Sequence, residues 1–291
     1  MKRHIDVDRF RVAPGTTVRL GDWPTRVKDF YRSKDDYKTR LDSQVGEMRT
    51  LQDRLYASDS YSLLVIFQAL DAAGKDGVIK HVMSGVNPQG CQVFSFKHPS
   101  STDLDHDFLW RTTICLPERG RIGIFNRSYY EEVLIVRVHP DLLRAERIPG
   151  VQKPTDRLWQ ERYQSIRNHE RHLRRNGTRI LKFYLHLSRD EQRERLLARI
   201  EDETKNWKFS EGDLEERKLW PRYMAAYAAC LSATSTRAAP WYCVPADDKK
   251  NARLIVAQAI VDELKRMNAQ YPRIDAAQQK KLKEIAKQLK D

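Results

Sequence analysis

The chain of 291 residues is long enough for one large α/β domain with appendages or for two small domains. It carries 53 lysines and arginines against 40 aspartates and glutamates, a net charge of +13. No apolar stretch reaches the length of a membrane span, and the first residues, MKRHIDVDRF, contain no apolar signal region, so we expect a cytoplasmic protein. The four cysteines lack CxxC spacing, which favours free thiols over zinc ligands.

The positive charge favours a polyanionic partner. Nucleic acid, an anionic membrane surface and a substrate made of linked phosphates would all fit. Charged helix faces can also produce such an excess without a partner, so charge alone does not separate these classes.

The first part of the chain predicts an arm, a helix and a strand. Residues 1–33 contain the turn signals Pro14-Gly15 and Trp23-Pro24, and we expect an arm that wraps around a domain. Ser33 to Tyr56 has apolar residues at three- and four-residue steps, which predicts a helix. The apolar run from Leu63 to Phe67 is typical of a buried strand.

A turn rich in small residues follows this strand, and a helix continues from Val78; the turn is Ala72-Ala73-Gly74-Lys75-Asp76-Gly77. Strand, tight turn and helix N-terminus form a cradle for phosphate, because free N–H groups and the positive helix dipole meet the anion there. Lys75 would add a full charge.

The turn departs from the general P-loop pattern, since Ala69 replaces a glycine and Asp76 replaces serine or threonine. The alternative is an ordinary turn with a surface lysine. Asp71 argues against that alternative, because a carboxylate beside a phosphate site requires a cation between them.

The rest of the chain alternates strands with helices. Strands are predicted at 91–96, 121–125, 178–187 and 241–244, and helices at 101–116, 155–175, 214–231, after the Ser188–Glu191 capping box, after Asp247 or Asp248, and from Ile274. Residues 130–137 are predicted to be helical or extended. This alternation predicts a parallel sheet with helices on both faces and a ligand site at the carboxyl ends of its strands.

A second strand end lies at the same predicted edge as Asp71. Asn126 and Arg127 follow the strand at 121–125, and a guanidinium can clamp phosphoryl oxygens. Asn126 is a weaker magnesium ligand than a carboxylate, so Asp71 is expected to carry more of the metal. Glu131 and Glu132 either contact the ligand or only stabilise the dipole of the next helix.

A polar segment between two predicted helices would cover this edge. Lys205 and Lys208 flank Trp207, which indicates a basic lid that shields the transferred group from water, or else a solvated turn. Lys80 and Arg137 supply further positive charge for a long anion.

Six segments resemble the polyphosphate kinase 2 family, over residues 30 to 268 or so: DAAGKDG (71–77), MSGVNPQG (83–90), LDHDFLWR (104–111), IGIFNRSYYEEVL (122–134), KNWKFS (205–210) and SATSTRAAPWYCVPADDK (232–249). The resemblance implies a thymidylate-kinase-like P-loop fold with a helical lid. It implies reversible, magnesium-dependent phosphoryl transfer between inorganic polyphosphate and a nucleotide. FNRSYYEEV is similar to the subgroup that phosphorylates both AMP and ADP.

The pattern and the resemblance together give a set of expected site residues. We expect Asp71, Lys75 and Arg127 to be catalytic, with Asp71 also holding Mg²⁺ or, alternatively, Mn²⁺. The expected phosphate contacts are Ala72, Ala73, Gly74, Asp76, Gly77, Lys80, Arg137, Lys205 and Lys208, and the expected nucleotide contacts are Asn87, Asn126, Glu131 and Glu132.

The expected organisation is an arm at 1–33, a catalytic domain at 34–270 with a lid at about 201–213, and an amphipathic helix at 271–291. The expected partners are inorganic polyphosphate and adenine nucleotides, with guanine nucleotides left open. We expect neither a nucleic-acid nor a membrane partner. The amphipathic helices near Lys34 and Ile274 either pair the subunits of an expected homo-oligomer or cover their own domain.

Two other functions remain as alternatives. An ATP-dependent nucleoside monophosphate kinase could use the same fold, although it should prefer a complete P-loop pattern, which is absent. A basic nucleic-acid-binding protein would suit the charge, but the sequence contains no recognisable reader module.

Overall fold

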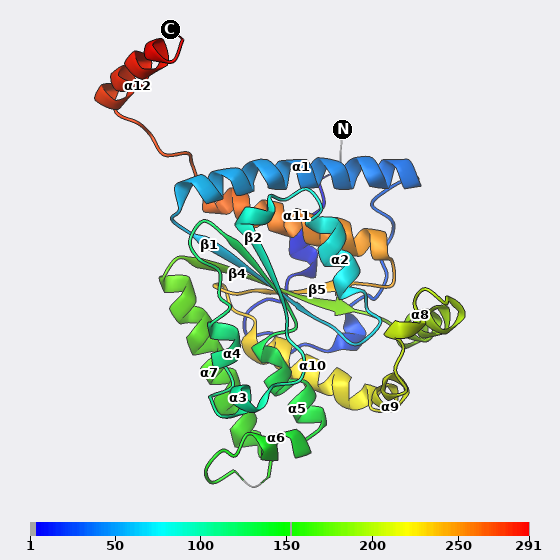
Figure 1. Ribbon diagram of the computed structural model, residues 1–291. Coiled ribbons are helices and arrows are strands. Elements are labelled where there is room, and N and C mark those ends of the chain that lie inside the picture. The colour runs from blue at the N-terminus through cyan, green and yellow to red at the C-terminus, as the bar shows by residue number, and fades with distance from the viewer. Residues whose placement is uncertain (1–3, 152, 291) are drawn as a thin grey trace.

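The computed structural model describes residues 4–151 and 153–290. Five strands form one parallel sheet in the order β2-β3-β1-β4-β5 (Figure 1). The strands are β1 (Ser62–Gln68), β2 (Cys91–Ser95), β3 (Ile122–Asn126), β4 (Thr178–His186) and β5 (Trp241–Pro245). The predicted strands and the predicted parallel sheet are therefore confirmed.

Helices cover both faces of the sheet (Figure 1). On one face, α1 (Lys34–Ser58), α2 (Lys75–Val82) and α11 (Lys249–Met267) pack on Leu63, Val65 and Phe67. On the other, α5 (Ile135–Val138), α7 (Asp156–Arg175) and α10 (Trp220–Thr234) pack on Leu64 and Ile66. Successive side chains of a strand point to opposite faces, so the continuous apolar run of β1 fills two cores at once.

The remaining elements are short or peripheral. They are α3 (Ser101–Leu104), α4 (Trp110–Thr113), α6 (Asp141–Ala145), α8 (Arg189–Glu201), α9 (Gly212–Lys218) and α12 (Ala276–Gln288), with the 3-10 helices η1 (Val7–Phe10), η2 (Leu20–Asp22), η3 (Pro88–Gly90), η4 (Tyr129–Val133) and η5 (Asn206–Lys208).

One helix prediction was wrong, and a second was correct except for a break at one residue. The segment 101–116 forms only the single turns α3 and α4, because Asp107 accepts a hydrogen bond from the backbone of Leu109 and starts a new turn there. The segment 214–231 is divided into α9 and α10 at Leu219. Pro221, which has no N–H to donate inside a helix, occupies the first turn of α10 instead.

The segment before α1 runs along the far edge of the sheet. The backbone N–H of Val12 donates to the carbonyl of Trp241 on β5 at 2.9 Å. The backbone N–H of Phe30 donates to Oδ1 of Asn251 on α11 at 3.0 Å. In the described part of this segment, residues 4–33, the chain thus covers β5 rather than forming a separate unit.

Two parts project from this body (Figure 1). The helices α8 and α9 extend beyond the carboxyl ends of the strands, and α12 stands apart near the C-terminus with no buried residue. Across residues 4–151 and 153–290, none of the helices combines the length and apolarity needed to cross a membrane.

Candidate active site at the carboxyl edge of the sheet

The turn after β1 has the geometry of a phosphate cradle. Gly74, at φ +97°, is the N-cap of α2, which begins at Lys75. The ammonium of Lys75 donates to the carbonyl of Ala69 at 2.8 Å. Ala72 also has a positive φ, +64°, which side chains other than glycine adopt at a cost. The turn is therefore held in a strained shape at the start of α2.

Lys75 is a buried residue, and its burial changes the pKa of its ammonium group. The side chain is only 8% exposed, and desolvation lowers its pKa, which the nearby Asp71 carboxylate opposes. Such a buried ammonium has few competing water molecules, so an incoming anion would interact with it strongly.

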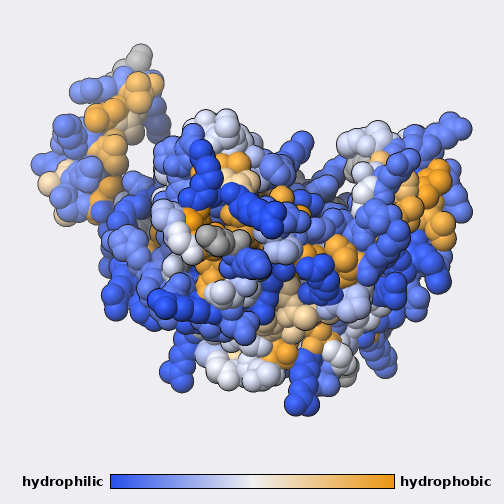
Figure 2. Space-filling model, turned by 90° about the horizontal axis from the view of Figure 1, so that it is seen from below, coloured by the Kyte–Doolittle hydropathy of each residue, from blue (hydrophilic) through white to orange (hydrophobic). Residues whose placement is uncertain are grey.

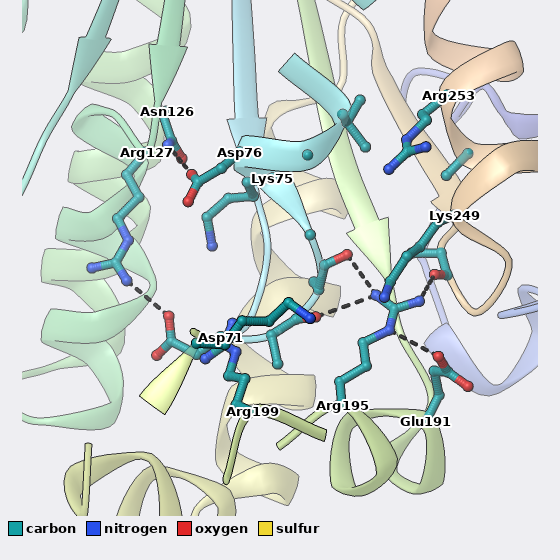
Figure 3. A pocket seen from close by; sticks show the side chains of 18 of the residues that line it. Asp71, Lys75, Asp76, Asn126, Arg127, Glu191, Arg195, Arg199, Lys249 and Arg253 are labelled. Carbon is teal, nitrogen blue, oxygen red and sulfur yellow. Dashed lines mark hydrogen bonds and ion pairs between the residues drawn. The ribbon is translucent and has the colours of Figure 1, made fainter. Parts of the chain in front are cut away.

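The end of β3 meets this turn directly. Nη2 of Arg127 donates to Oδ1 of Asp71 at 2.9 Å, and Nδ2 of Asn126 donates to Oδ1 of Asp76 at 2.7 Å (Figure 3). Arg127 adopts a positive φ of +67°. Its pKa is lowered by burial but raised overall, because Glu131 and Asp71 more than offset the desolvation.

A basic cavity of about 810 Å³ opens over the cradle. Ten of the expected site residues line it: Asp71 to Gly77, Asn126, Arg127 and Lys205. Five further cations that the sequence analysis did not assign to the site also line it: Lys97, Arg195, Arg199, Lys249 and Arg253.

Arg195 holds helix α8 against the cradle. Its guanidinium donates to the carbonyls of Ala73 at 2.9 Å and Ala246 at 2.6 Å, and it forms an ion pair with Glu191 at 2.8 Å. One arginine therefore connects α8 to two loops at the edge of the sheet, the turn after β1 and the segment after β5.

The spacing of four of the additional cations is a sequence signal for this site. Arg195 and Arg199 on α8, and Lys249 and Arg253 on α11, are four residues apart and therefore share a helix face. Burial, followed by repulsion from Arg195, lowers the pKa of Lys249. Cations gathered this closely indicate a site for an anion of high charge.

A side cavity of about 260 Å³ lies next to the basic cavity and shares Phe96, Lys97 and Arg127 with it. Glu131 and Glu132 line the side cavity. Burial raises the pKa of Glu131, against the effect of Arg127. Burial and the neighbouring Glu146 raise the pKa of Glu132 to about 7.

A third cavity, of about 120 Å³, lies between the strand ends and α9. Asp71, Arg127 and Glu131 line it from the sheet side, and Asp213 and Glu216 line it from α9. Burial, and then the charge of Asp71, raise the pKa of Asp213. Arg127 lines all three cavities and is therefore the point where they meet.

Three expected site residues line none of these three cavities. Lys80 is exposed on α2, and Asn87 caps η3 by accepting from the backbone of Gln89. Arg137 donates to the hydroxyl of Tyr163 at 2.7 Å and stacks on an α7 tryptophan. The side chain of Lys208 lies outside the described part of the structure.

The side chains at this site include a carboxylate that could bind Mg²⁺. Within residues 4–151 and 153–290, no group of three or more histidines, cysteines or carboxylates is arranged to hold a metal ion. Mg²⁺ in phosphoryl-transfer sites uses only one or two carboxylates and takes its other ligands from substrate phosphates and water. The side chain of Asp71, 42% exposed in the basic cavity, fits that requirement.

Solved structures similar to this chain include polyphosphate kinase 2 from Arthrobacter aurescens TC1, with a TM-score of 0.84 and 38% identity over 94% of this chain and 95% of that one. Similar proteins include the ADP-polyphosphate phosphotransferase of Rhodopseudomonas palustris, 60% identical over 98% of this chain and 99% of the relative. The AMP/ADP-polyphosphate phosphotransferase of Meiothermus ruber is 45% identical, covering 94% and 98%.

The sequence model of the family described as polyphosphate kinase 2 matches residues 31–272, which include β1 to β5, the cradle, α8 and α9. This match and the three relatives agree with one another. The chain belongs to the polyphosphate kinase 2 family.

Proposed function

We propose that this protein transfers a phosphoryl group from inorganic polyphosphate to ADP and also to AMP, in a reversible reaction. The basic cavity carries the proposal. Its volume of about 810 Å³ far exceeds the space of one phosphate, and cations from α2, α8 and α11 face it. A chain of linked phosphates is a ligand with matching length and charge. The names of the Rhodopseudomonas and Meiothermus relatives support this substrate class.

The donor chain would lie along the basic cavity with its end phosphate at the cradle. The N–H groups at the start of α2 and the ammonium of Lys75 would bind that phosphate, while Arg253 and Lys249 would hold phosphates farther along. Phosphoryl transfer has little covalent chemistry for the protein to perform, so alignment and spread positive charge supply most of the catalysis.

The acceptor would approach from the other side of Arg127. Because Arg127 lines all three cavities, its guanidinium can contact donor and acceptor phosphates together. It would neutralise charge as the acceptor oxygen attacks the terminal phosphorus in line, the bond from that phosphorus to its bridging oxygen breaks, and the chain leaves one phosphate shorter. Asp71 keeps the guanidinium in place through the 2.9 Å hydrogen bond.

Magnesium would be held by Asp71 together with substrate phosphates, with Mn²⁺ as a substitute, and it would neutralise phosphate charge. Arg199 on α8 and Lys205 in the expected lid segment line the basic cavity as well. Closure of α8 and α9 over the substrates would exclude water, which would otherwise hydrolyse the donor chain without phosphorylating the nucleotide.

The experiment is a reaction of purified protein with Mg²⁺, long-chain polyphosphate and either ADP or AMP, without added ATP. Chromatography separates the nucleotides. ATP from ADP supports the polyphosphate-dependent activity, and ADP or ATP from AMP supports the second acceptor. Transfer to AMP with ATP as the sole effective donor would favour the ordinary nucleotide kinase instead.

We also propose a homo-oligomer with α12 as a separate pairing element. Leu282 and Ile285 on α12 and Leu289 at its C-cap form an exposed apolar stripe, away from the body (Figure 2). The proposed organisation of the chain is an arm at 1–33, a catalytic domain at 34–270 and a C-terminal helix at 271–291. Light scattering of the full chain and of a chain ending at Gln270 tests this, because the shorter chain should have the smaller mass per particle.

A further inference from the structure

Helix α8 supplies hydrogen-bond donors to three successive carbonyls of the cradle. Nε2 of Gln192 donates to the carbonyl of Asp71 at 3.1 Å. Nη1 of Arg195 donates to the carbonyls of Ala72 at 3.2 Å and Ala73 at 2.9 Å. The positive φ of Ala72 costs free energy in a residue that has a side chain. These hydrogen bonds therefore help to hold the turn in its strained shape.

Gln192 also contacts α9. Its Oε1 accepts from Nη1 of Arg217 at 2.8 Å. The side chain of Gln192 is only 5% exposed, so little water competes for either end of its amide. A guanidinium only donates and a backbone carbonyl only accepts, so the two partners fix the orientation of the amide. One buried side chain therefore joins α9 to the backbone of Asp71.

Polar contacts hold α9 in place. Each residue of this helix is at least partly exposed. The carboxylate of Glu216 lies 2.9 Å from Nε2 of His139 and accepts from the hydroxyl of Tyr223. Arg217 donates to the carbonyl of Arg189 at 2.7 Å in addition to its contact with Gln192. A segment held by a few hydrogen bonds opens at a lower cost in free energy than the core, so α9 can move while the sheet stays intact.

We propose that Gln192 is a positioning residue that aligns Asp71 for catalysis while α9 is in the position seen in the structure. The inference rests on the proposed function, in which Asp71 holds the metal ion and orients Arg127. With α9 in place, Arg217 holds the amide of Gln192 in the orientation that reaches the carbonyl of Asp71.

Movement of α9 would release this contact. Oε1 of Gln192 would lose its partner and the amide could rotate, so the support of the Asp71 backbone would weaken. The carboxylate of Asp71 would then be aligned only when α9 covers the site and excludes water.

The transmission from α9 to the cradle is tested with Arg217→Met. The hydrogen bonds of Arg217 run to Gln192 and Arg189, both on α8. Hydrogen–deuterium exchange without substrates is measured in segments 69–77 and 212–218. Exchange should become about fivefold faster or more in both segments, because loss of one buried hydrogen bond loosens each of them. Faster exchange in 212–218 alone would overturn the inference.

The double variant Gln192→Met/Arg217→Met tests whether Gln192 is the link. Methionine has a similar length but neither donates nor accepts, so Gln192→Met alone should already loosen the cradle. Adding Arg217→Met should not accelerate the exchange of 69–77 further, since the connection is already broken. A further acceleration of similar size would show that Arg217 acts through another route and would overturn the role of Gln192.

Initial rates with polyphosphate and ADP give a second readout. Each single variant should lower kcat about tenfold, with both KM values within about twofold of wild type, because Gln192 aligns a group that acts in the transition state. The double variant should be no slower than the slower single variant. More phosphate should be released per ATP formed, because water enters the loosened site. Higher KM values with unchanged kcat would contradict a positioning role.

The matched control is Gln164→Met. Gln164 lies on an exposed part of α7, where it accepts from Nη2 of Arg167 at 2.6 Å and donates to Oδ1 of Asn168 at 2.7 Å. This amide has the same pattern of partners, but it lies away from the cradle. The control should match wild type in the exchange of both segments and in kcat. If Gln192→Met does not fold, the exchange of 69–77 in Arg217→Met decides the question alone.

The two proposals fail separately. Absence of polyphosphate-dependent transfer would refute the proposed function, whereas the exchange experiment requires no substrate and would still test the link. Normal transfer, together with a cradle that is unaffected by Arg217→Met, would leave the reaction intact and overturn the role of Gln192.

Discussion

Arg127 and Asp71 follow neighbouring strands of the sheet, and a 2.9 Å hydrogen bond joins Nη2 of the arginine to Oδ1 of the aspartate. Arg127 adopts a positive φ, so its backbone is strained in the conformation that places this side chain beside Asp71. The guanidinium can bind two oxygens in a fixed plane while it keeps its contact with Asp71. The pair is therefore the structural link between the two strand ends of the site.

Replacing Arg127 by lysine tests this link. The substitution keeps the charge but removes the planar, two-pronged donor, and we expect kcat to fall by about 10²- to 10³-fold. The assay is ATP formation from ADP and polyphosphate. Arg121→Lys is the control, because Arg121 precedes the opposite end of β3 and pairs with Glu118. Similar activity of both variants would contradict the assigned role.

Lys75→Met should separate activity from stability. The methionine keeps the length of the side chain but removes a buried charge that no carboxylate pairs within ion-pair distance among the described residues. Removing its desolvation cost should leave Tm unchanged or higher, while polyphosphate-dependent activity falls at least about 10²-fold. Thermal unfolding and the nucleotide assay on one preparation check both parts. A marked fall in Tm would show that the lysine serves the fold.

Arg253→Gln should weaken the binding of polyphosphate. Because phosphate chains release counterions on binding, we expect KM for polyphosphate to rise, its salt dependence to weaken, and KM for ADP to stay unchanged. Initial rates at several salt concentrations provide the measurement. Arg266→Gln, at the other end of α11 beside Glu263, is the control and should behave as wild type. An equal rise in both KM values would place Arg253 elsewhere in the mechanism.

Glu132 should make the stability of the protein depend on pH. Its pKa is about 7 in the folded chain against 4.5 for the ordinary carboxyl, mainly because of burial and then Glu146. The unfolded chain loses this proton first, so the contribution of Glu132 to the free energy of unfolding is largest at low pH and decreases as pH rises from about 4.5 to 7.

Glu132→Gln removes this contribution and should flatten the curve. Relative to wild type, the variant should gain about 1–3 kcal/mol between pH 5 and pH 7.5. Urea unfolding at several pH values measures the difference. Parallel curves for the two proteins would mean that Glu132 stays ionised throughout.

The buried network around Lys182 should be a major stabilising contact. Glu170 accepts from Nζ of Lys182 at 2.8 Å, from Tyr130 at 2.7 Å and from Tyr129 at 3.0 Å. Glu170→Gln would leave a buried ammonium without its counter-charge, and we expect a loss of about 3–5 kcal/mol in urea unfolding. Adding Lys182→Met should restore part of it. Additive losses in the double variant would argue against a coupled pair.

Much of the local structure follows from short-range preferences. β-Branched and apolar runs form β1 and β4, and Ser33, Thr155, Ser188 and Asp248 each cap the helix that they precede by accepting a backbone N–H. The cradle is equally local, because Gly74 lies between a strand and a helix that its neighbours already favour. The alternation of elements was enough to predict the parallel sheet, and with it the meeting of Asp71 and Arg127.

Other features depend on contacts between distant segments. Arg195 donates to the carbonyl of Ala73, which lies 122 residues earlier in the sequence. Arg253 lines the same basic cavity as Ala73, although it lies on α11, the last helix before α12. Helical periodicity places such residues on the polar face of a helix. It does not show whether that face will lie against the cradle. The side cavity is bounded by the loop after β2 and by α3, α4, η4, α5 and α6, and its buried carboxylates gain their properties only when these elements enclose them. Desolvation is a property of the packed chain, which is why the amino-acid order alone did not reveal it.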